Sequence, residues 1–227
     1  MVLHPESVRR GSQPYDLMRP GRIDYFQALA MQQQRVETLI NQGGPNLLIL
    51  LEHPPVYTVG RSGKPGEVLG LGAGCSSIPV IPTDRGGRVT YHGPGQLVAY
   101  VIRDLRPDTG RVLDHVRRLE ELVLRTLADF GIQGSRERIN PGVWVGQEKI
   151  AALGVRIRRG ITYHGIAINR DPDLAHFSGI IPCGIMDRGV TSMARLGCRV
   201  TSEALEASLL SIFTEVFDAS LTPCQEQ

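Results

Sequence analysis

The strongest constraint on the fold is an alternation of short apolar runs with three longer segments whose apolar residues follow helical spacing. Helices are expected at about 22–42, 111–130 and 202–217, and glycines supply stops after the first two. Strands are expected at 46–51, 56–59, 78–81, 88–91, 97–103, 142–145, 149–157 and 161–169. This order predicts an α/β (α+β) chain with mixed β-sheets flanked by helices.

Glycine and proline separate these elements. His53-Pro54-Pro55 predicts an exposed turn, and Arg158-Arg159-Gly160 predicts a tight hairpin connection. The segment 60–77 is rich in glycine and serine and lacks periodicity, which predicts a mobile loop. We expect the segments 1–20 and 220–227 to be peripheral, with the tail beyond Ser220 frayed.

Length and composition predict one globular domain over residues 1–227. With 227 residues, 41% of them hydrophobic, the chain can bury a substantial core. The net charge of 25 − 23 = +2 argues against a general nucleic-acid binder or a membrane-surface protein. The four cysteines form no C-x-x-C pair, and no signal sequence or membrane-length apolar run is seen. The chain is therefore expected in the cytoplasm, with no metal site, no nucleic-acid partner and no membrane partner.

Two residues are candidate reactive groups. Lys149 is, with Lys64, one of only two lysines among 25 basic residues, and it precedes an apolar strand of small residues. An ammonium placed there is partly desolvated and releases its proton more readily. Cys183 lies between a proline that stiffens the chain and a glycine that permits close approach, which is how a nucleophile is often presented.

Each of these residues also has an ordinary interpretation. Most free cysteines are small buried hydrophobes, and we expect Cys75, Cys198 and Cys224 to be either that or incidental surface thiols. A lysine at the start of a strand is usually solvated. The segment 84–96 favours the functional interpretation. Within thirteen residues it combines an arginine, two glycines that let the backbone approach a ligand, and a Thr90-Tyr91-His92 strand with polar side chains.

Four sequence blocks resemble the lipoyl(octanoyl) transferases, which are similar in fold to the biotin and lipoate protein ligases. The blocks occur in the family's order, and the resemblance reaches from about Leu48 to Met193. They are Arg85-Gly86-Gly87-x-Val89-Thr90-Tyr91-His92-Gly93-Pro94-Gly95-Gln96, Lys149-Ile150-Ala151-Ala152-Leu153-Gly154, His164-Gly165-Ile166-Ala167-Ile168-Asn169 and Pro182-Cys183-Gly184.

The resemblance implies octanoyl transfer from octanoyl-acyl carrier protein to a specific lysine of a lipoyl domain, the first step of protein lipoylation. Lipoyl domains of 2-oxoacid dehydrogenase complexes and the glycine cleavage H protein are the implied acceptors, and no cofactor is implied. Cys183 would form the acyl thioester, and Lys149 would favour the cysteine thiolate. The implied substrate-binding positions are Arg85, Gly86, Gly87, Arg88, Val89, Thr90, Tyr91, His92, Ala152, Leu153, Gly154, Gly165, Ile166 and Ala167. Some relatives carry serine where this chain has Ala152.

Two other functions stay open at this point. An ATP-dependent lipoate or biotin protein ligase would use the same fold, and a non-catalytic module could bind an acylated carrier protein; neither needs a nucleophilic cysteine. The sequence leaves open which backbone N–H groups stabilise an oxyanion, and whether His92 and His164 are catalytic or structural. Arg156, Arg158 and Arg159 could form a basic docking rim or an ordinary solvated turn.

Overall fold

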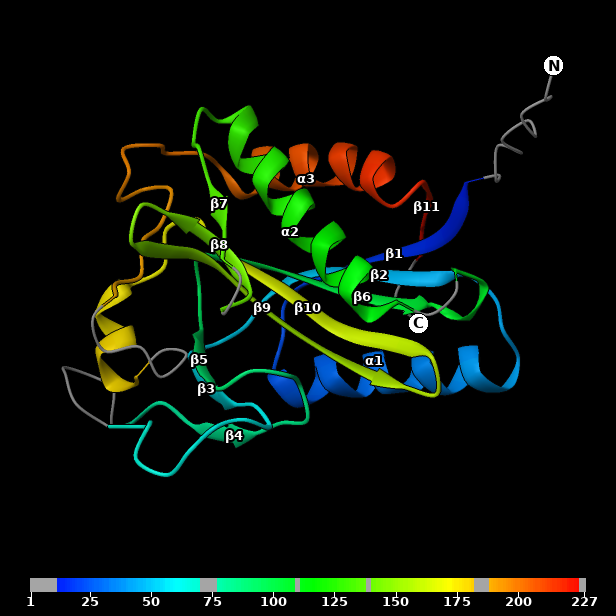
Figure 1. Ribbon diagram of the computed structural model, residues 1–227, viewed down its shortest axis with the longest axis horizontal. Helices are drawn as coiled ribbons and strands as arrows, with labels where there is room; N and C mark the ends of the chain where they lie inside the picture. The colour runs from blue at the N-terminus through cyan, green and yellow to red at the C-terminus, as the bar shows by residue number, and fades with distance from the viewer. Residues whose placement is uncertain (1–11, 70–76, 109–110, 138–139, 182–187, 225–227) are drawn as a thin grey trace, which may run out of the picture.

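An eight-stranded mixed sheet forms the centre of the chain (Figure 1). The computed structural model describes residues 12–69, 77–108, 111–137, 140–181 and 188–224. In spatial order the strands are β11 (Ala219–Pro223), β1 (Gln13–Arg22), β2 (Asn46–Glu52), β6 (Gln96–Asp104), β10 (Ile161–Asn169), β9 (Glu148–Arg158), β8 (Gly142–Val145) and β7 (Ser135–Arg136). A smaller sheet has the order β4 (Val80–Pro82), β3 (Val56–Val59) and β5 (Val89–His92).

Helices cover both faces of the large sheet. Helix α1 (Tyr25–Asn41) lies on one face, and α2 (Val112–Asp129) and α3 (Ser202–Val216) lie together on the other (Figure 1). Two short 3-10 helices, η2 (Arg106–Asp108) and η3 (Leu174–Gly179), complete the described elements. Within the described residues, no helix is long and apolar enough to cross a membrane.

The uninterrupted apolar run of β2 follows from this layering. Successive side chains of a strand point to opposite faces of the sheet. Leu48 and Leu50 therefore pack in the core under α2 and α3, whereas Leu47, Ile49 and Leu51 pack under α1. A strand buried on both faces has no position at which a polar side chain would be solvated.

The three helices and eight strands expected from the sequence are confirmed, with bounds that differ by one or two residues at most ends. The hairpin between β9 and β10 is also confirmed. Arg159 and Gly160 have φ angles of 48° and 85°, as a two-residue type I′ turn requires. Of the neighbouring arginines, Arg158 pairs with Glu37 at 2.6 Å and Arg156 faces Asp84 at 3.9 Å.

The expectation of a frayed tail beyond Ser220 is wrong. Strand β11 runs parallel to β1, with residues 219–223 opposite residues 13–17, and β1 in turn pairs with β2. Both strands are polar or interrupted by proline, and β1 shifts register between Met18 and Gly21. The hydrogen bonds between β1 and β11 join opposite ends of the chain. No local sequence pattern therefore predicts these two strands.

A buried histidine on α2 makes the stability of the fold depend on pH. His115 is 1% exposed and packs edge-on against Phe217, and neither of its ring nitrogens has a hydrogen-bond partner among the described residues. Burial, reinforced by the charges of Arg103 and Arg118, lowers the pKa of His115 to about 3. The imidazole is therefore neutral in the folded chain and gains a proton on unfolding below about pH 6.5.

We predict that His115→Met weakens the acid sensitivity of the fold. The contribution of the neutral His115 to the free energy of unfolding is complete above about pH 6.5. It is lost as the pH falls towards about 3, at about 1.4 kcal/mol per pH unit. Between pH 7 and pH 5 the parent should therefore lose roughly 2 kcal/mol that the variant keeps. Urea unfolding at both pH values measures the difference, and parallel stability curves would contradict it.

Candidate active site

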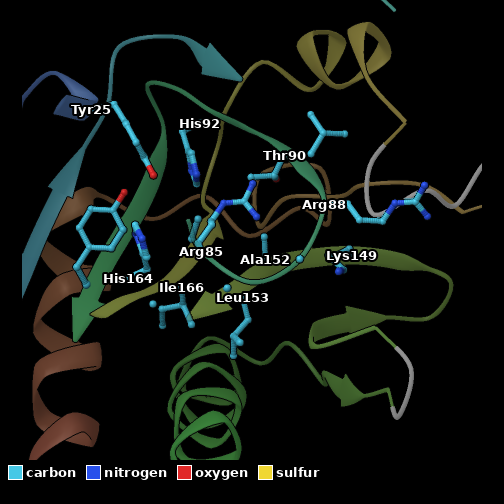
Figure 2. A pocket seen from close by; sticks show the side chains of 16 residues that line it. Tyr25, Arg85, Arg88, Thr90, His92, Lys149, Ala152, Leu153, His164 and Ile166 are labelled. Carbon is cyan, nitrogen blue, oxygen red and sulfur yellow. The ribbon is translucent and has the colours of Figure 1, made fainter. Parts of the chain in front are cut away.

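A cavity of about 50 Å³ lies between the segment 85–92 and strands β9 and β10. Figure 2 shows Lys149 and Arg88 towards one end, Tyr25 and His164 towards the other, and Arg85 between them. All the predicted substrate-binding positions line this cavity except Gly86 and Tyr91. The lining residues are Tyr25, Arg85, Gly87, Arg88, Val89, Thr90, His92, Tyr100, Lys149, Ala152, Leu153, Gly154, His164, Gly165, Ile166 and Ala167.

The two exceptions have clear positions. Gly86 lines an adjoining hollow of about 330 Å³, which shares Lys149 and Arg88 with the cavity. Tyr91 is buried in another cluster, where its ring meets Phe177 at 5.3 Å and its hydroxyl lies 2.8 Å from Nδ1 of His176. On β5, consecutive side chains alternate, so Tyr91 points away from the cavity that its neighbours line.

The Arg85 guanidinium holds the loop that carries it. It is buried and donates to the carbonyl oxygen and the hydroxyl of Thr58 at 2.7 and 2.8 Å, and to the carbonyl oxygen of Gly86 at 3.0 Å. Charge-assisted hydrogen bonds of this kind are among the stronger ones in proteins. Arg85 thus ties its own segment, residues 85–88, here called the glycine loop, to β3 while lining the cavity.

The same loop lies directly on β9. The N–H of Gly86 donates to the carbonyl oxygen of Val155 at 2.9 Å. A Cβ atom on Gly154 would lie 2.8 Å from the carbonyl oxygen of Gly86, so glycine is needed for this approach. Because the Gly86 N–H is already donated to Val155, it is not an oxyanion donor in this arrangement.

Lys149 is buried at one end of the cavity with only 6% of its surface exposed. Its Nζ donates to the carbonyl oxygen of Pro141 at 3.2 Å and lies 4.8 Å from the Trp144 ring centroid. The Arg188 guanidinium lies 5.3 Å from the same ring. Contact with an aromatic face stabilises a cation, and more strongly away from water.

Cys183 lies outside the described residues, but both neighbouring segments are tied to the site. On the amino-terminal side, the N–H of Ile181 donates to the carbonyl oxygen of Glu67 at 2.8 Å. On the carboxy-terminal side, the carbonyl oxygen of Gly189 accepts from the backbone N–H of Lys149 at 3.0 Å. Glu67 also pairs with Arg88, so Ile181 and Gly189 are each bonded to a cavity-lining residue or to the partner of one.

His92 belongs to a hydrogen-bond relay whose direction is fixed. The Asn169 amide donates to the carbonyl oxygen of Thr191 at 2.9 Å, and the Gln96 amide donates to Tyr91 and Asn169 oxygens at 3.1 and 2.9 Å. The remaining Gln96 oxygen accepts from Nδ1–H of His92 at 3.2 Å. Burial lowers the pKa of His92 well below its usual value, so the ring is neutral and its Nε2 is an acceptor. This arrangement disfavours an oxyanion-donor role for His92.

The far end of the cavity is closed by neutral aromatic groups that the sequence did not single out. Tyr100 donates to Nε2 of His53 at 2.8 Å, and Tyr25 donates to Thr83 at 2.9 Å. Burial raises the pKa of both tyrosines. Tyr25 reaches the cavity from α1 and Tyr100 from β6, so only the tertiary fold brings them beside the glycine loop.

Sequence comparison places the chain in a family. The family model of the lipoyl protein ligase A/B catalytic domain matches residues 24–214. An octanoyltransferase from Magnetococcus marinus is 49% identical over 86% of this chain and 90% of its own length. The chain belongs to the octanoyltransferase family. Another member, from Paramagnetospirillum magneticum, is 46% identical over 87% of this chain and 93% of its own length, and the chain is accordingly an acyltransferase.

Solved structures confirm the expected likeness of fold. Lipoate-protein ligase A bound with ATP aligns with a TM-score of 0.71 at 17% identity, covering 95% of this chain and 90% of that one. A bi-partite lipoate protein ligase from Thermoplasma acidophilum aligns with a TM-score of 0.69 at 16% identity, covering 94% and 88%. At such low identity these ligases share the single-domain fold, and the side chains decide the chemistry.

We predict that Gly87→Val closes the cavity to an alkyl chain. Gly87 lines the cavity at φ 85°, whereas Gly197 has the same φ and no atom within 4 Å of the place that a Cβ would occupy. Both valine variants should lose about 1–2 kcal/mol of stability, because left-handed backbone disfavours a side chain. Only Gly87→Val should weaken the binding of octanoic acid, measured by calorimetry, by about tenfold or more. Equal affinities in the two variants would count against this role of the loop.

Proposed function

We propose that the chain transfers an octanoyl group from octanoyl-acyl carrier protein to a lysine of a lipoyl domain, through a thioester on Cys183. The observation that carries the proposal is the position of Lys149. Its buried ammonium lies at the end of the cavity, and its backbone N–H is bound to the carbonyl oxygen of Gly189, which follows Cys183 in the sequence. The acceptors proposed are the lipoyl domains of 2-oxoacid dehydrogenase complexes and the glycine cleavage H protein.

In the first half-reaction the Cys183 thiolate attacks the carbonyl carbon of the donor thioester. The new C–S bond forms as the carrier's thiolate leaves, and that thiolate takes up the proton that the Lys149 ammonium gives up. Because one thioester replaces another, the step is nearly isoenergetic and needs no ATP. A cation beside the cysteine favours its thiolate, and Lys149 supplies that charge in our proposal.

In the second half-reaction the amine of the acceptor lysine attacks the acyl-enzyme. The C–N bond of the amide forms, the C–S bond breaks, and Cys183 departs as a thiolate. Acylation has removed the negative charge beside Lys149, so its ammonium has passed a proton to the departing carrier thiolate. The resulting amine accepts one proton from the ammonium of the acceptor lysine, and the second proton of that nitrogen passes to solvent as the amide forms. One side chain thereby serves both half-reactions.

In our proposal the apolar chain of the substrate enters the cavity in one direction. With its carbonyl end near Lys149, the chain would pass Ala152 and Leu153 towards Tyr25 and the other neutral groups at the far end. Each buried methylene contributes about 0.8 kcal/mol. Arg88, which lines the cavity, pairs with Glu67, and the carbonyl oxygen of Glu67 accepts from the backbone N–H of Ile181, two residues before Cys183.

Cys183→Ala is expected to abolish transfer. Incubation of the parent with octanoyl-acyl carrier protein in the absence of ATP should add one octanoyl group, detected by intact mass, and Cys183→Ala should show none. Cys198→Ala and Cys224→Ala are the matched controls, since both are half-buried free thiols among the described residues, and both should keep activity. Cys75→Ala should keep it too. Transfer by Cys183→Ala near the parent's rate would exclude the thioester route, and a requirement for ATP would favour a ligase.

Substitutions of Lys149 should separate its two proposed roles. Lys149→Met should move the alkylation of Cys183 to higher pH, each unit corresponding to about 1.4 kcal/mol of lost thiolate stabilisation. Lys149→Arg keeps a cation but supplies no base, so the acyl-enzyme should form and then accumulate. Lys64→Met removes the exposed second lysine and should behave as the parent.

Two measurements test these roles of Lys149. Alkylation rate against pH reports the thiolate, and mass detection after mixing with the donor reports the acyl-enzyme. An unshifted alkylation profile in Lys149→Met, or normal turnover in Lys149→Arg, would overturn the dual role of Lys149.

A further inference from the structure

Asp84, which precedes the glycine loop directly, is bound by side chains of two other strands. Its Oδ1 accepts from Nε2–H of His164 at 3.0 Å, and its Oδ2 accepts from the Tyr163 hydroxyl, both on β10. Arg156 of β9 adds its charge, with Nε 3.9 Å from Oδ2. Neither the sequence pattern nor the proposed transfer chemistry gives Asp84 a role.

The backbone of His164 makes this double contact possible. Tyr163 and His164 are consecutive residues of a strand, so their side chains would ordinarily point to opposite faces. His164 instead adopts φ 61°, one of three positive values among the described non-glycine residues. Its ring then stacks on Tyr163 with centroids 4.8 Å apart, and both side chains reach one carboxylate. Such a conformation costs about 1–3 kcal/mol and persists only where the surroundings hold it.

A side chain of helix α1 helps to stabilise the left-handed backbone of His164. Oε1 of Gln32, which is 1% exposed, accepts from the backbone N–H of His164 at 2.8 Å. This bond satisfies a buried donor at the point where the left-handed residue departs from regular strand geometry. The unusual backbone of His164 is therefore supported from a separate layer of the fold.

The charges of the cluster are fixed as well. The hydrogen bond from His164, with further help from Tyr163 and Arg156, lowers the pKa of Asp84 to about 2. Burial, followed by the hydrogen bond to Asp84, raises the pKa of Tyr163 to about 12, and burial lowers the pKa of His164. A protonated His164 would also bury a second N–H, because Nδ1 has no partner among the described residues. Two neutral donors, Tyr163 and His164, therefore bind an ionised Asp84 carboxylate.

We propose that Asp84, Tyr163 and His164 form a positioning clamp. The clamp keeps the glycine loop at the distance from β9 and β10 that the acyl chain requires. The loop is fixed at three successive points: Asp84 to β10, the Arg85 guanidinium to Thr58, and the Gly86 N–H to Val155. Gly87 and Arg88, the next two residues, line the cavity. The clamp rests on the proposed function, because the cavity is taken as the octanoyl site.

Two independent variants test the clamp, each of which alters one partner of the hydrogen bond between Asp84 and His164. Asp84→Asn removes the charge with little change of shape. His164→Gly removes the imidazole, and because glycine accepts a positive φ without strain, the relief of strain offsets part of the stability lost with the buried ring. Both should raise the KM for octanoyl-acyl carrier protein about tenfold and change kcat much less, since the clamp touches no reacting atom.

Conservative and distant substitutions serve as controls. His164→Asn tolerates a left-handed backbone and offers a side-chain N–H, so it should recover part of the lost affinity. Glu215→Gln breaks an ion pair with Arg125 between α3 and α2, away from the cavity, and should leave KM unchanged. A merely structural role would lower the melting temperature of Asp84→Asn and leave KM as in the parent.

Hydrogen exchange gives a readout that does not depend on activity. Backbone amides of residues 85–88 should exchange faster in Asp84→Asn and His164→Gly, while those of α3 keep the parent's rate. Unchanged exchange at 85–88 together with an unchanged KM would overturn the clamp. If the parent itself gained no octanoyl adduct, the proposed function would fail, and the exchange experiment would still decide whether Asp84 holds the loop.

Discussion

The contact on which the site depends is the close packing of the glycine loop on β9. Gly86 and Gly154 lack side chains where the two backbones approach, which permits the hydrogen bond between the Gly86 N–H and the carbonyl oxygen of Val155. A larger residue at either position would push the loop away from the strand. The wall of the cavity would then move with it, because Arg85, Gly87 and Arg88 follow from the same loop.

Electrostatics divide the cavity into two ends. Tyr25, Tyr100 and His92 close one end in neutral form, because burial disfavours their charged states. The other end holds the buried ammonium of Lys149, which contacts Trp144 and a backbone carbonyl. In our proposal the uncharged alkyl chain occupies the neutral end and the reacting thioester lies at the charged end. The difference in polarity would then orient the substrate without any ion pair to it.

The comparison with lipoate protein ligases separates scaffold from chemistry. Their chains superpose on most of this one, yet fewer than one residue in five is shared with those described above. The octanoyltransferases share nearly half. The fold can therefore be kept while most side chains change. In our proposal the reacting groups of this chain are a cysteine that carries the acyl group and one lysine that assists it.

The sequence by itself determined the helices, most strands and nearly all the residues that line the cavity. Apolar periodicity is a local property and marks the helices and strands directly, whereas the cavity residues follow from the family resemblance of the blocks around Arg85, Lys149 and Gly165. Only the tertiary structure decided that β11 pairs with β1, that Tyr25 closes the cavity, and that His164 turns towards Asp84. These features depend on hydrogen bonds and packing between residues far apart in the chain. No local pattern encodes such contacts, because their partners meet only once the sheet and its helices have assembled.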